Sequence, residues 1–248
     1  MVKKARIQAE MTAPVDCACV IHGNAYDWIY VDKLRSMLVR NFSRPVNLHV
    51  WTEAHRSVPA PFIKHDLYEW PGISGPRKSW WYKIQMFNSN YFQGRLIYFD
   101  LDTIIVRNID WLINLDADYL WAPRDFRHHW KGQWSGINSS IMVWNTTKFD
   151  WIWRNFNQNN ITSTVKRFPG DQDYLTNVLD NTNRRYMDAD MVKSWRWQIK
   201  DGGMNFKTRQ YKRPDAGSIL DPLTSIIIFH GQPKPHEIHE PFIQQHWG

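Results

Sequence analysis

The sequence predicts an α/β sandwich in which helices cover a mostly parallel, mixed sheet. Short apolar segments typical of buried strands alternate with segments of helical periodicity along most of the chain. The 248 residues can bury one substantial core, and no repeat or low-complexity linker divides them. We therefore expect an N-terminal extension (1–14), a single domain (15–235) and a C-terminal tail (236–248).

The first half of the chain is expected to contain three strands separated by two helices. Ile29, Leu34 and Leu38 recur at helical spacing, and Pro45 ends that helix before an alternating apolar strand begins. Prolines and glycines then mark the loops. In order, the expected elements are strand 15–21, helix 26–41, strand 46–50, loops over 59–76, helix 80–92 and strand 95–107.

The second half continues the alternation. It contains the expected strands 119–122 and 137–144, the helices 149–157 and 171–179, and a short buried strand, 225–230. The stretch 200–222, with three glycines and several basic residues, is expected to be a mobile lid or a long surface excursion. Ligands of such folds gather at the carboxyl ends of strands, so the loops there should carry the chemistry.

The most informative segment is 95–107, an apolar run interrupted at its middle by Asp100 and Asp102. Side chains two apart on a strand project to one face, and two buried carboxylates repel unless a proton or cation compensates them. Oxygen ligands on one face suit Mg²⁺ or Mn²⁺, with open positions for a phosphate-bearing substrate. A lone Asp-x-Asp is common at solvent-facing strand ends, but the apolar flanks favour a metal site.

Three further segments carry chemistry. His230 ends a strand and is followed by Gly231 and Lys234, so its imidazole suits a third metal ligand and the lysine suits a phosphate. Asp171 and Gln172 open a helix, where capping explains one acid but not the Asp-Gln-Asp cluster. The segment 136–143 places small polar residues before an apolar strand, where they suit a sugar or form a plain turn.

The composition says more about the cellular compartment of the protein than about its binding partner. The formal charge is +7, which attracts nucleotide phosphates, acidic glycans, nucleic acid or anionic lipid without choosing among them. Most of the 15 tryptophans are expected in the core, although the segments 121–134 and 151–153 could also platform an acceptor glycan. Cys17 and Cys19 lie too close on one strand for a disulfide, which favours buried free thiols. Without a signal peptide or membrane span, we expect a cytoplasmic protein, with peripheral membrane contact left open.

In this order, the segments resemble the retaining glycosyltransferases of family 8, which include glycogenin and the bacterial lipo-oligosaccharide galactosyltransferases and have the GT-A fold. The resemblance spans about residues 15–235 and rests on an ordered set of motifs, none of which is specific alone. The matching segments are Asn24-Ala25-Tyr26, Lys83, Phe99-Asp100-Leu101-Asp102-Thr103, Asn138-Ser139, Gly170-Asp171-Gln172 and Gly231-x-x-Lys234-Pro235.

The resemblance implies a GT-A-like glycosyltransferase domain with an Asp-x-Asp strand. It implies that Asp100, Asp102 and His230 hold Mn²⁺ (or Mg²⁺) on the diphosphate of a nucleotide-sugar, most simply a UDP-sugar. Asp171 and Gln172 would be the catalytic pair that binds the donor sugar. The other expected donor-binding residues are Tyr26, which would stack on the base, Lys83, Asn138, Ser139 and Lys234, besides Asp100.

The resemblance also implies transfer to a glycan or another hydroxyl acceptor with retention of configuration, without a covalent intermediate. Two positions depart from the family. Ser140 stands where glycine is usual, and His230 lies one residue before the glycine of Gly-x-x-Lys-Pro rather than three. Positions one and three before that glycine share a strand face, so His230 can reach the same metal by a small shift.

Other readings remain open at this point. A nucleotidyltransferase or metal phosphoesterase would use the same aspartate pair but release pyrophosphate or a monophosphate. A non-catalytic, tryptophan-rich carbohydrate-binding protein would not need Asp100, Asp102 and His230 as a set. Nucleic acid is not an expected partner, because the basic residues are dispersed rather than massed in one element.

Overall fold

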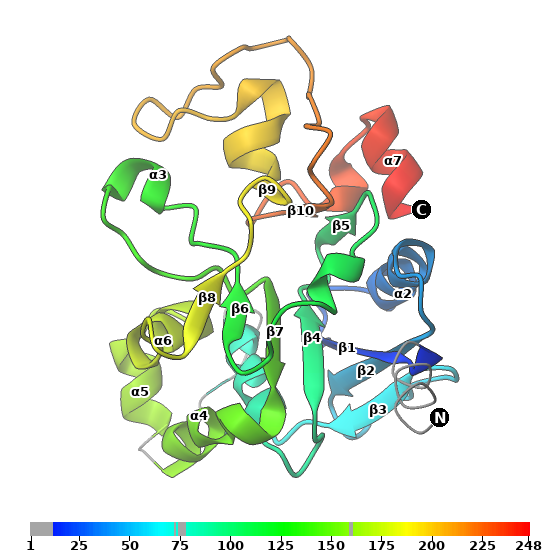
Figure 1. Cartoon of the computed structure of the whole chain (residues 1–248), viewed down its shortest axis with the longest axis vertical. Helices are drawn as coiled ribbons and strands as arrows, with labels where there is room; N and C mark the ends of the chain where they lie inside the picture. Colours follow the sequence, from blue (N-terminus) through cyan, green and yellow to red (C-terminus); the bar gives the residue numbers. More distant parts are fainter. Residues whose placement is uncertain (1–11, 72, 74–77, 159–160) are drawn as a thin grey trace, which may run out of the picture.

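The computed structural model describes residues 12–248 except 72, 74–77 and 159–160 (Figure 1). Most of the expected N-terminal extension, residues 1–11, therefore lies outside the described part of the chain. The same holds for Gly72 and for 74–77 in the loop region after the third strand.

Within the described residues, a main sheet of seven strands forms the centre of the molecule. Its spatial order is β3-β2-β1-β4-β7-β6-β8, and β7 alone runs against the other strands. The expected mostly parallel, mixed sheet is confirmed. The strands are β1 (Val15–Val20), β2 (Val46–Thr52), β3 (Ile63–Asp66), β4 (Arg95–Phe99), β6 (Leu120–Ala122), β7 (Ile141–Asn145) and β8 (Arg184–Tyr186).

A smaller sheet of β5 (Thr103–Ile105), β10 (Ile226–Ile228) and β9 (Val192–Ser194) lies beside the main one. In it β10 is central, antiparallel to β5 and parallel to β9. Because β4 ends at Phe99 and β5 begins at Thr103, the chain passes from the large sheet to the small one between these two residues.

Helices cover both faces of the main sheet. The α-helices are α2 (Ile29–Asn41), α3 (His128–Lys131), α4 (Thr146–Gln158), α5 (Ile161–Arg167), α6 (Asp171–Val178) and α7 (Pro241–Trp247). The 3₁₀ segments are η1 (Ser79–Phe87), η2 (Asp110–Leu112), η4 (Lys200–Gly202) and η5 (Pro235–Glu237), and η3 (Trp195–Ile199) is a π-helical turn. In Figure 1, α2 and α7 lie side by side on the right, and α4, α5 and α6 lie at the lower left.

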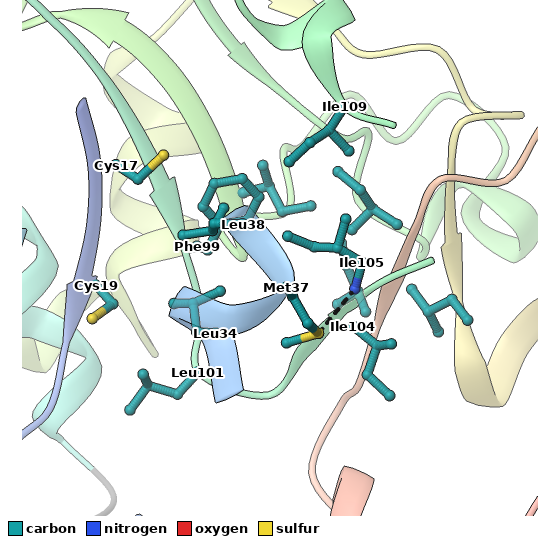
Figure 2. Close-up of a cluster of buried hydrophobic side chains, with 14 of the residues drawn as sticks. Cys17, Cys19, Leu34, Met37, Leu38, Phe99, Leu101, Ile104, Ile105 and Ile109 are labelled. Carbon is teal, nitrogen blue, oxygen red and sulfur yellow. Dashed lines mark hydrogen bonds between the residues drawn. The ribbon is translucent and has the colours of Figure 1, made fainter. Parts of the chain in front are cut away.

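The central strands are largely apolar on both faces because each face supports its own core. Alternate residues of β4 separate accordingly: Ile97 and Phe99 pack with α2, whereas Leu96 and Tyr98 pack with η1 and α4. Figure 2 shows the first core, where Met37 of α2 also accepts a hydrogen bond from the Ile105 amide, N to Sδ 3.3 Å.

Several expected boundaries are corrected. Asp100 and Asp102 do not lie on a strand; they occupy a turn closed by the Thr103 amide, which donates to the Asp100 carbonyl at 3.2 Å. The expected helix 80–92 is a shorter 3₁₀ segment, η1, and the helix expected from residue 26 begins at Ile29. The strand that was expected over 137–144 is β7, which begins only at Ile141.

The expected C-terminal tail is part of the core instead. It contains η5 and α7, and Ile238, Ile243 and Trp247 are buried in the hydrophobic cluster of α2. The prediction for the cysteines is confirmed, since Cys17 and Cys19 are free and buried. In the described ranges, none of the helices combines the length and apolarity that crossing a bilayer requires.

Candidate functional site

A cavity of about 580 Å³ opens beyond the carboxyl ends of β1 and β4. This is the edge where ligands of α/β folds gather, because loops there can bring side chains from several strands together. Every site residue expected from the sequence lines it. They are Tyr26, Lys83, Asp100, Asp102, Asn138, Ser139, Asp171, Gln172, His230 and Lys234.

Lys83 of η1 joins two of the carboxylates. It is buried, and its Nζ lies 2.8 Å from Oδ1 of Asp100 and 3.6 Å from Oδ2 of Asp171. Burial by itself lowers the pKa of Lys83, but the two carboxylates outweigh it and hold that pKa above its usual value. A full positive charge is therefore fixed at the floor of the cavity.

Asp100 stays ionised although it is partly buried. The Tyr98 hydroxyl donates to its Oδ1 at 2.5 Å, and its amide donates to the Ser140 carbonyl at 2.7 Å. Burial alone raises the pKa of Asp100, yet Lys83 and the hydrogen bonds from Tyr98 and Ser140 bring it below the usual value.

Asp102 has a separate set of partners. Its Oδ2 lies 2.6 Å from Nζ of Lys234 and accepts from the Tyr26 hydroxyl at 2.9 Å, while Lys234 also donates to that hydroxyl at 2.6 Å. Burial and the nearby charge of Asp100 raise the pKa of Asp102 despite these partners. The pKa values of the two aspartates are thus shifted in opposite directions, as expected for carboxylates that lie close together and have different partners.

The side chain of Tyr26 was expected to stack on a nucleobase. In the structure its hydroxyl faces Asp102, and the Lys234 ammonium lies 4.9 Å from its ring centroid. A nucleobase would have to stack on a face of the Tyr26 ring, and the Lys234 ammonium lies over one such face. Stacking on a base therefore stays a prediction.

Asp171 and Gln172 begin α6 at the wall of the same cavity. Asp171 is buried, and burial, together with the charge of Asp100, raises its pKa in spite of Lys83 and Ser139. Oε1 of Gln172 accepts from Nδ2 of Asn138 and from the Ser139 amide, both at 3.3 Å. The structure therefore brings the two expected segments, before β7 and at α6, into direct contact.

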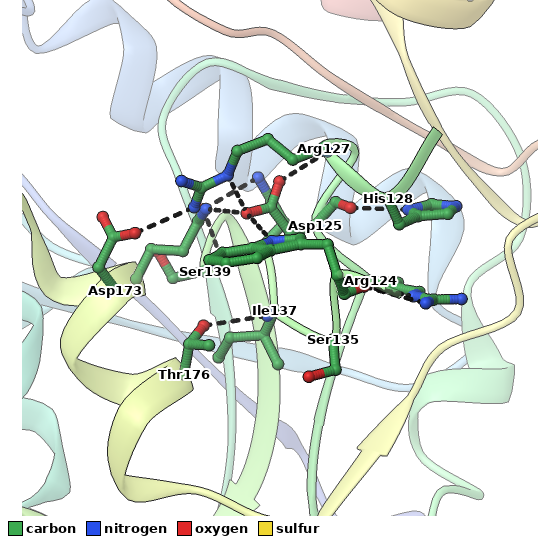
Figure 3. Close-up of polar contacts among 12 residues, drawn as sticks. Arg124, Asp125, Arg127, His128, Ser135, Ile137, Ser139, Asp173 and Thr176 are labelled. Atoms are coloured by element: carbon green, nitrogen blue, oxygen red, sulfur yellow. Dashed lines mark hydrogen bonds and ion pairs between the residues drawn. The ribbon is translucent and has the colours of Figure 1, made fainter. Parts of the chain in front are cut away.

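The other end of the Gln172 amide is held by Asp125, a residue that the sequence did not single out. Nε2 of Gln172 donates to Oδ2 of Asp125 at 2.9 Å, and Arg127 and Trp134 donate to the same oxygen at 2.5 and 3.0 Å. Arg127 also pairs with Asp173 at 3.1 Å, as Figure 3 shows. Asp125 follows β6, so its place after a strand end was the available signal.

Two other residues of the site were also missed. Tyr98 sits inside β4, where an aromatic residue looks like core, and only its hydroxyl reveals the contact with Asp100. Trp80 lines the cavity from η1. By contrast, Trp121, Trp151 and Trp153 are partly buried and pack against the hydrophobic clusters.

His230 has the properties of an available ligand. Its Nε2 is buried and has no hydrogen-bond partner among the described residues, and its ring contacts Phe126 edge-on at 5.0 Å between centroids. Burial lowers the pKa of His230 to about 4, so the imidazole is neutral and its lone pair can bind a cation.

The donor chemistry of the cavity fits a divalent cation. Two carboxylates and a neutral imidazole without a partner line one space, which is a set that Mn²⁺ or Mg²⁺ accepts. In the described part of the chain, however, no three His, Cys, Asp or Glu side chains gather closely enough to form a complete metal site. Positive charge beside Asp102 comes from Lys234 instead.

Comparison with solved structures identifies the fold. The galactosyltransferase LgtC, solved in complex with donor and acceptor sugar analogues, superimposes with a TM-score of 0.62 at 12% identity over 89% of each chain. The glycosyltransferase GlyE of Streptococcus pneumoniae TIGR4 gives a TM-score of 0.62 at 15% identity over 89% of this chain and 56% of GlyE.

The bifunctional glycosyltransferase WbbM is similar over 90% of this chain and 47% of its own, with a TM-score of 0.56 and 13% identity. No protein-family model matches the sequence, and no curated protein sequence matches it. At these identities the likeness concerns the fold. The chain has the GT-A-type α/β fold that these glycosyltransferases share, as the resemblance of its motifs predicted.

Proposed function

We propose that this chain is a metal-dependent glycosyltransferase that moves a sugar from a UDP-sugar to a hydroxyl group of a glycan, with retention of configuration. One observation carries the proposal: all ten residues expected from the motifs converge in a single cavity, at the ligand-binding edge of a GT-A-type fold. The residues come from segments as far apart as Tyr26 and Lys234.

The diphosphate of the donor would lie beside Lys234 and the metal site. Asp100, Asp102 and His230 would hold Mn²⁺ or Mg²⁺, which supplies positive charge to the leaving diphosphate as a Lewis acid. Lys234 would pair with the phosphate oxygens as a point charge. Lys83 is committed to Asp100 and Asp171, so it acts by fixing these two carboxylates rather than by reaching the donor.

The donor sugar would occupy the part of the cavity that Asp171, Gln172, Asn138 and Ser139 line together. In the proposed reaction the acceptor oxygen bonds to the anomeric carbon while the bond from that carbon to the diphosphate oxygen breaks. The acceptor proton passes to the leaving diphosphate on the same face. The Gln172 amide, held by Asp125, Asn138 and Ser139, is pre-organised to place its carbonyl near the sugar.

The decisive experiment is a donor screen. We expect one UDP-sugar, with Mn²⁺ present, to release UDP in the presence of glycan acceptors, and we expect Asp102→Asn to slow this release by about 100-fold. Asp118→Asn is the matched control, because Asp118 is an exposed aspartate outside the cavity. Unchanged turnover in Asp102→Asn would contradict the proposal. Release of pyrophosphate or a nucleoside monophosphate would instead indicate a nucleotidyltransferase or phosphoesterase.

Stereochemistry needs its own measurement. The anomeric proton of the first product, followed by NMR before mutarotation, should show the configuration of the donor. An inverted product would leave the transferase assignment intact but remove the proposed retaining mechanism.

A further inference from the structure

A second and larger cavity, of about 1020 Å³, shares none of its described lining residues with the first. Its walls come from β9, from η3 and from the excursion 200–222, which Figure 1 shows arching over the yellow η3 turn. The stretch expected to be a lid or surface excursion therefore encloses a space.

The charge of this cavity is one-sided. Its described lining includes four cationic side chains, Lys193, Lys207, Lys212 and Arg213, and a single acidic one, Asp221. Lys193 is paired with Asp190 at 2.8 Å. The other three cations are exposed and have no carboxylate partner in the described part of the chain.

The pKa of a neighbouring histidine is affected by the same positive charges. His129 lines the cavity, and after burial and His128, the nearby charges of Lys212 and Lys193 lower its pKa. The first cavity is different, because Asp100, Asp102 and Asp171 balance Lys83 and Lys234 there. An anion would thus be attracted to the second cavity by charges that no internal partner neutralises.

Aromatic side chains accompany the cations. Trp197 and Phe206 line the cavity with ring centroids 5.4 Å apart, and the Arg209 guanidinium lies 4.4 Å from the Phe206 ring. Flat apolar faces beside polar groups suit the faces of sugar rings, whereas a free phosphate ion would gain little from them.

The small sheet and one pair of stacked aromatic side chains connect the two cavities. Lys193 of β9 stands in register with Ile227 of β10, the strand that leads to His230. Trp195, at the start of η3, stacks on Phe229 with centroids 5.5 Å apart, and Phe229 lines the first cavity. Trp195, Phe229 and the paired strands β9 and β10 therefore connect the surroundings of the two cavities.

We propose that the second cavity binds an acidic glycan, one that carries carboxylate or phosphate groups, and that this glycan is the acceptor. This inference rests on the proposed transferase function. Lys207, Lys212 and Arg213 bind the anionic groups, while Trp197 and Phe206 pack against the sugar rings.

Isothermal titration calorimetry of the full chain tests the site. The probes are a glucuronate-containing tetrasaccharide, a phosphorylated tetrasaccharide and neutral maltotetraose. We expect at least one acidic probe to bind more tightly than the neutral one, and we expect Lys207→Gln/Lys212→Gln to weaken that binding about tenfold. Since both lysines are exposed, the double variant should fold, which thermal unfolding checks.

The matched control is Lys148→Gln/Lys166→Gln, which removes the same charge from α4 and α5, away from both cavities. Acidic and neutral probes that bind equally, or two double variants that lose affinity equally, would overturn the inference. So would binding to phosphatidylglycerol vesicles, lost in the Lys207/Lys212 variant, without binding to either acidic tetrasaccharide. Titration of the unaltered chain with UDP-sugars is a separate arm: its failure would remove the transferase function and the acceptor role, whether or not a glycan binds.

Discussion

Asp125 is a carboxylate that acts through its neighbours. It is only 4% exposed, and one of its oxygens accepts from Arg127, Trp134 and Gln172 together. A primary amide can present either end to a partner, so the contact with a pure acceptor decides which end of Gln172 faces Ser139. The orientation of the Gln172 amide is thus set by Asp125, which lies outside the cavity lining.

The change Asp125→Asn tests this role. An asparagine retains the size but cannot accept with both ends, so Gln172 loses its fixed orientation; we expect the turnover of the donor sugar to fall about tenfold with a smaller change in KM. Steady-state rates over a range of donor concentrations separate the two parameters. A fall in thermal stability with unchanged turnover would show that Asp125 is merely structural.

Glu53 should make folding stability depend on acid. Burial alone raises its pKa, but hydrogen bonds from Arg56 and the Gly23 amide, with O–N distances of 2.9 and 2.5 Å, lower the pKa to about 2. Because the folded-state pKa is the lower one, the stabilisation is complete above the unfolded value of 4.5 and is lost as the pH falls towards 2.

Replacement of this carboxylate should therefore matter at neutral pH and not in acid. We expect Glu53→Gln to lower the free energy of unfolding by about 2–3 kcal/mol at pH 7, and the difference from the unaltered chain to shrink below about pH 4. Urea unfolding at several pH values measures it. Glu69→Gln is the control, since that carboxylate is 56% exposed. A difference independent of pH would contradict the assignment.

At the scale of elements, the helix α2 is attached to the fold by one buried apolar face. Leu34, Met37 and Leu38 are fully buried against β4, β5 and the C-terminal helix, whereas Val39 is 48% exposed. The stability of the helix in the fold therefore depends on a narrow apolar stripe more than on its N-terminus, where Trp28 makes no side-chain cap hydrogen bond.

Truncation on this stripe should be costly. We expect Leu34→Ala to lower the free energy of unfolding by about 3 kcal/mol, because it leaves a cavity that the surrounding β-strands cannot close. Val39→Ala on the same helix should change it by less than about 0.5 kcal/mol. Equal losses in chemical denaturation would mean that the buried face is not the one described.

The elements that could be predicted are those with buried apolar runs. β1, β4 and β10 were evident because both of their faces are covered, so nearly every residue is apolar. β3, with the sequence Ile-Lys-His-Asp, and β8, with Arg-Arg-Tyr, lie at the two edges of the sheet. Edge strands are short and polar, so no periodicity marks them.

The sequence predicted that the motif residues share one cavity, but it did not predict how they pair. Motif order brought Asp102 and Lys234 to one cavity, yet nothing in the sequence states that these residues, 132 positions apart, would form an ion pair. The turn at Asp100 and Asp102 looked like a strand because its flanks are apolar; only the existence of two sheets explains why the chain leaves one strand and enters another there.

At the scale of the whole molecule, binding of the proposed metal should stabilise the folded state. Mn²⁺ that binds the folded chain alone, at about 100 times its Kd, adds about 2.7 kcal/mol of stability and raises Tm by about 5–10 °C. Differential scanning calorimetry with Mn²⁺ and then with a chelator measures this. Asp100→Asn should abolish the shift and Asp118→Asn should keep it; a shift that persists in Asp100→Asn would place the ion elsewhere.

The turn of residues 100–102 joins two sheets that otherwise carry separate hydrogen-bond ladders. Asp100 is anchored to the large sheet through the Ser140 carbonyl, and Asp102 precedes the first strand of the small one. Anything that grips both carboxylates must therefore hold the small sheet still against the large one. Amide hydrogen exchange should slow along β5 and β10 when the cavity is filled, so that occupancy of the site would be recorded in the protection of the small sheet.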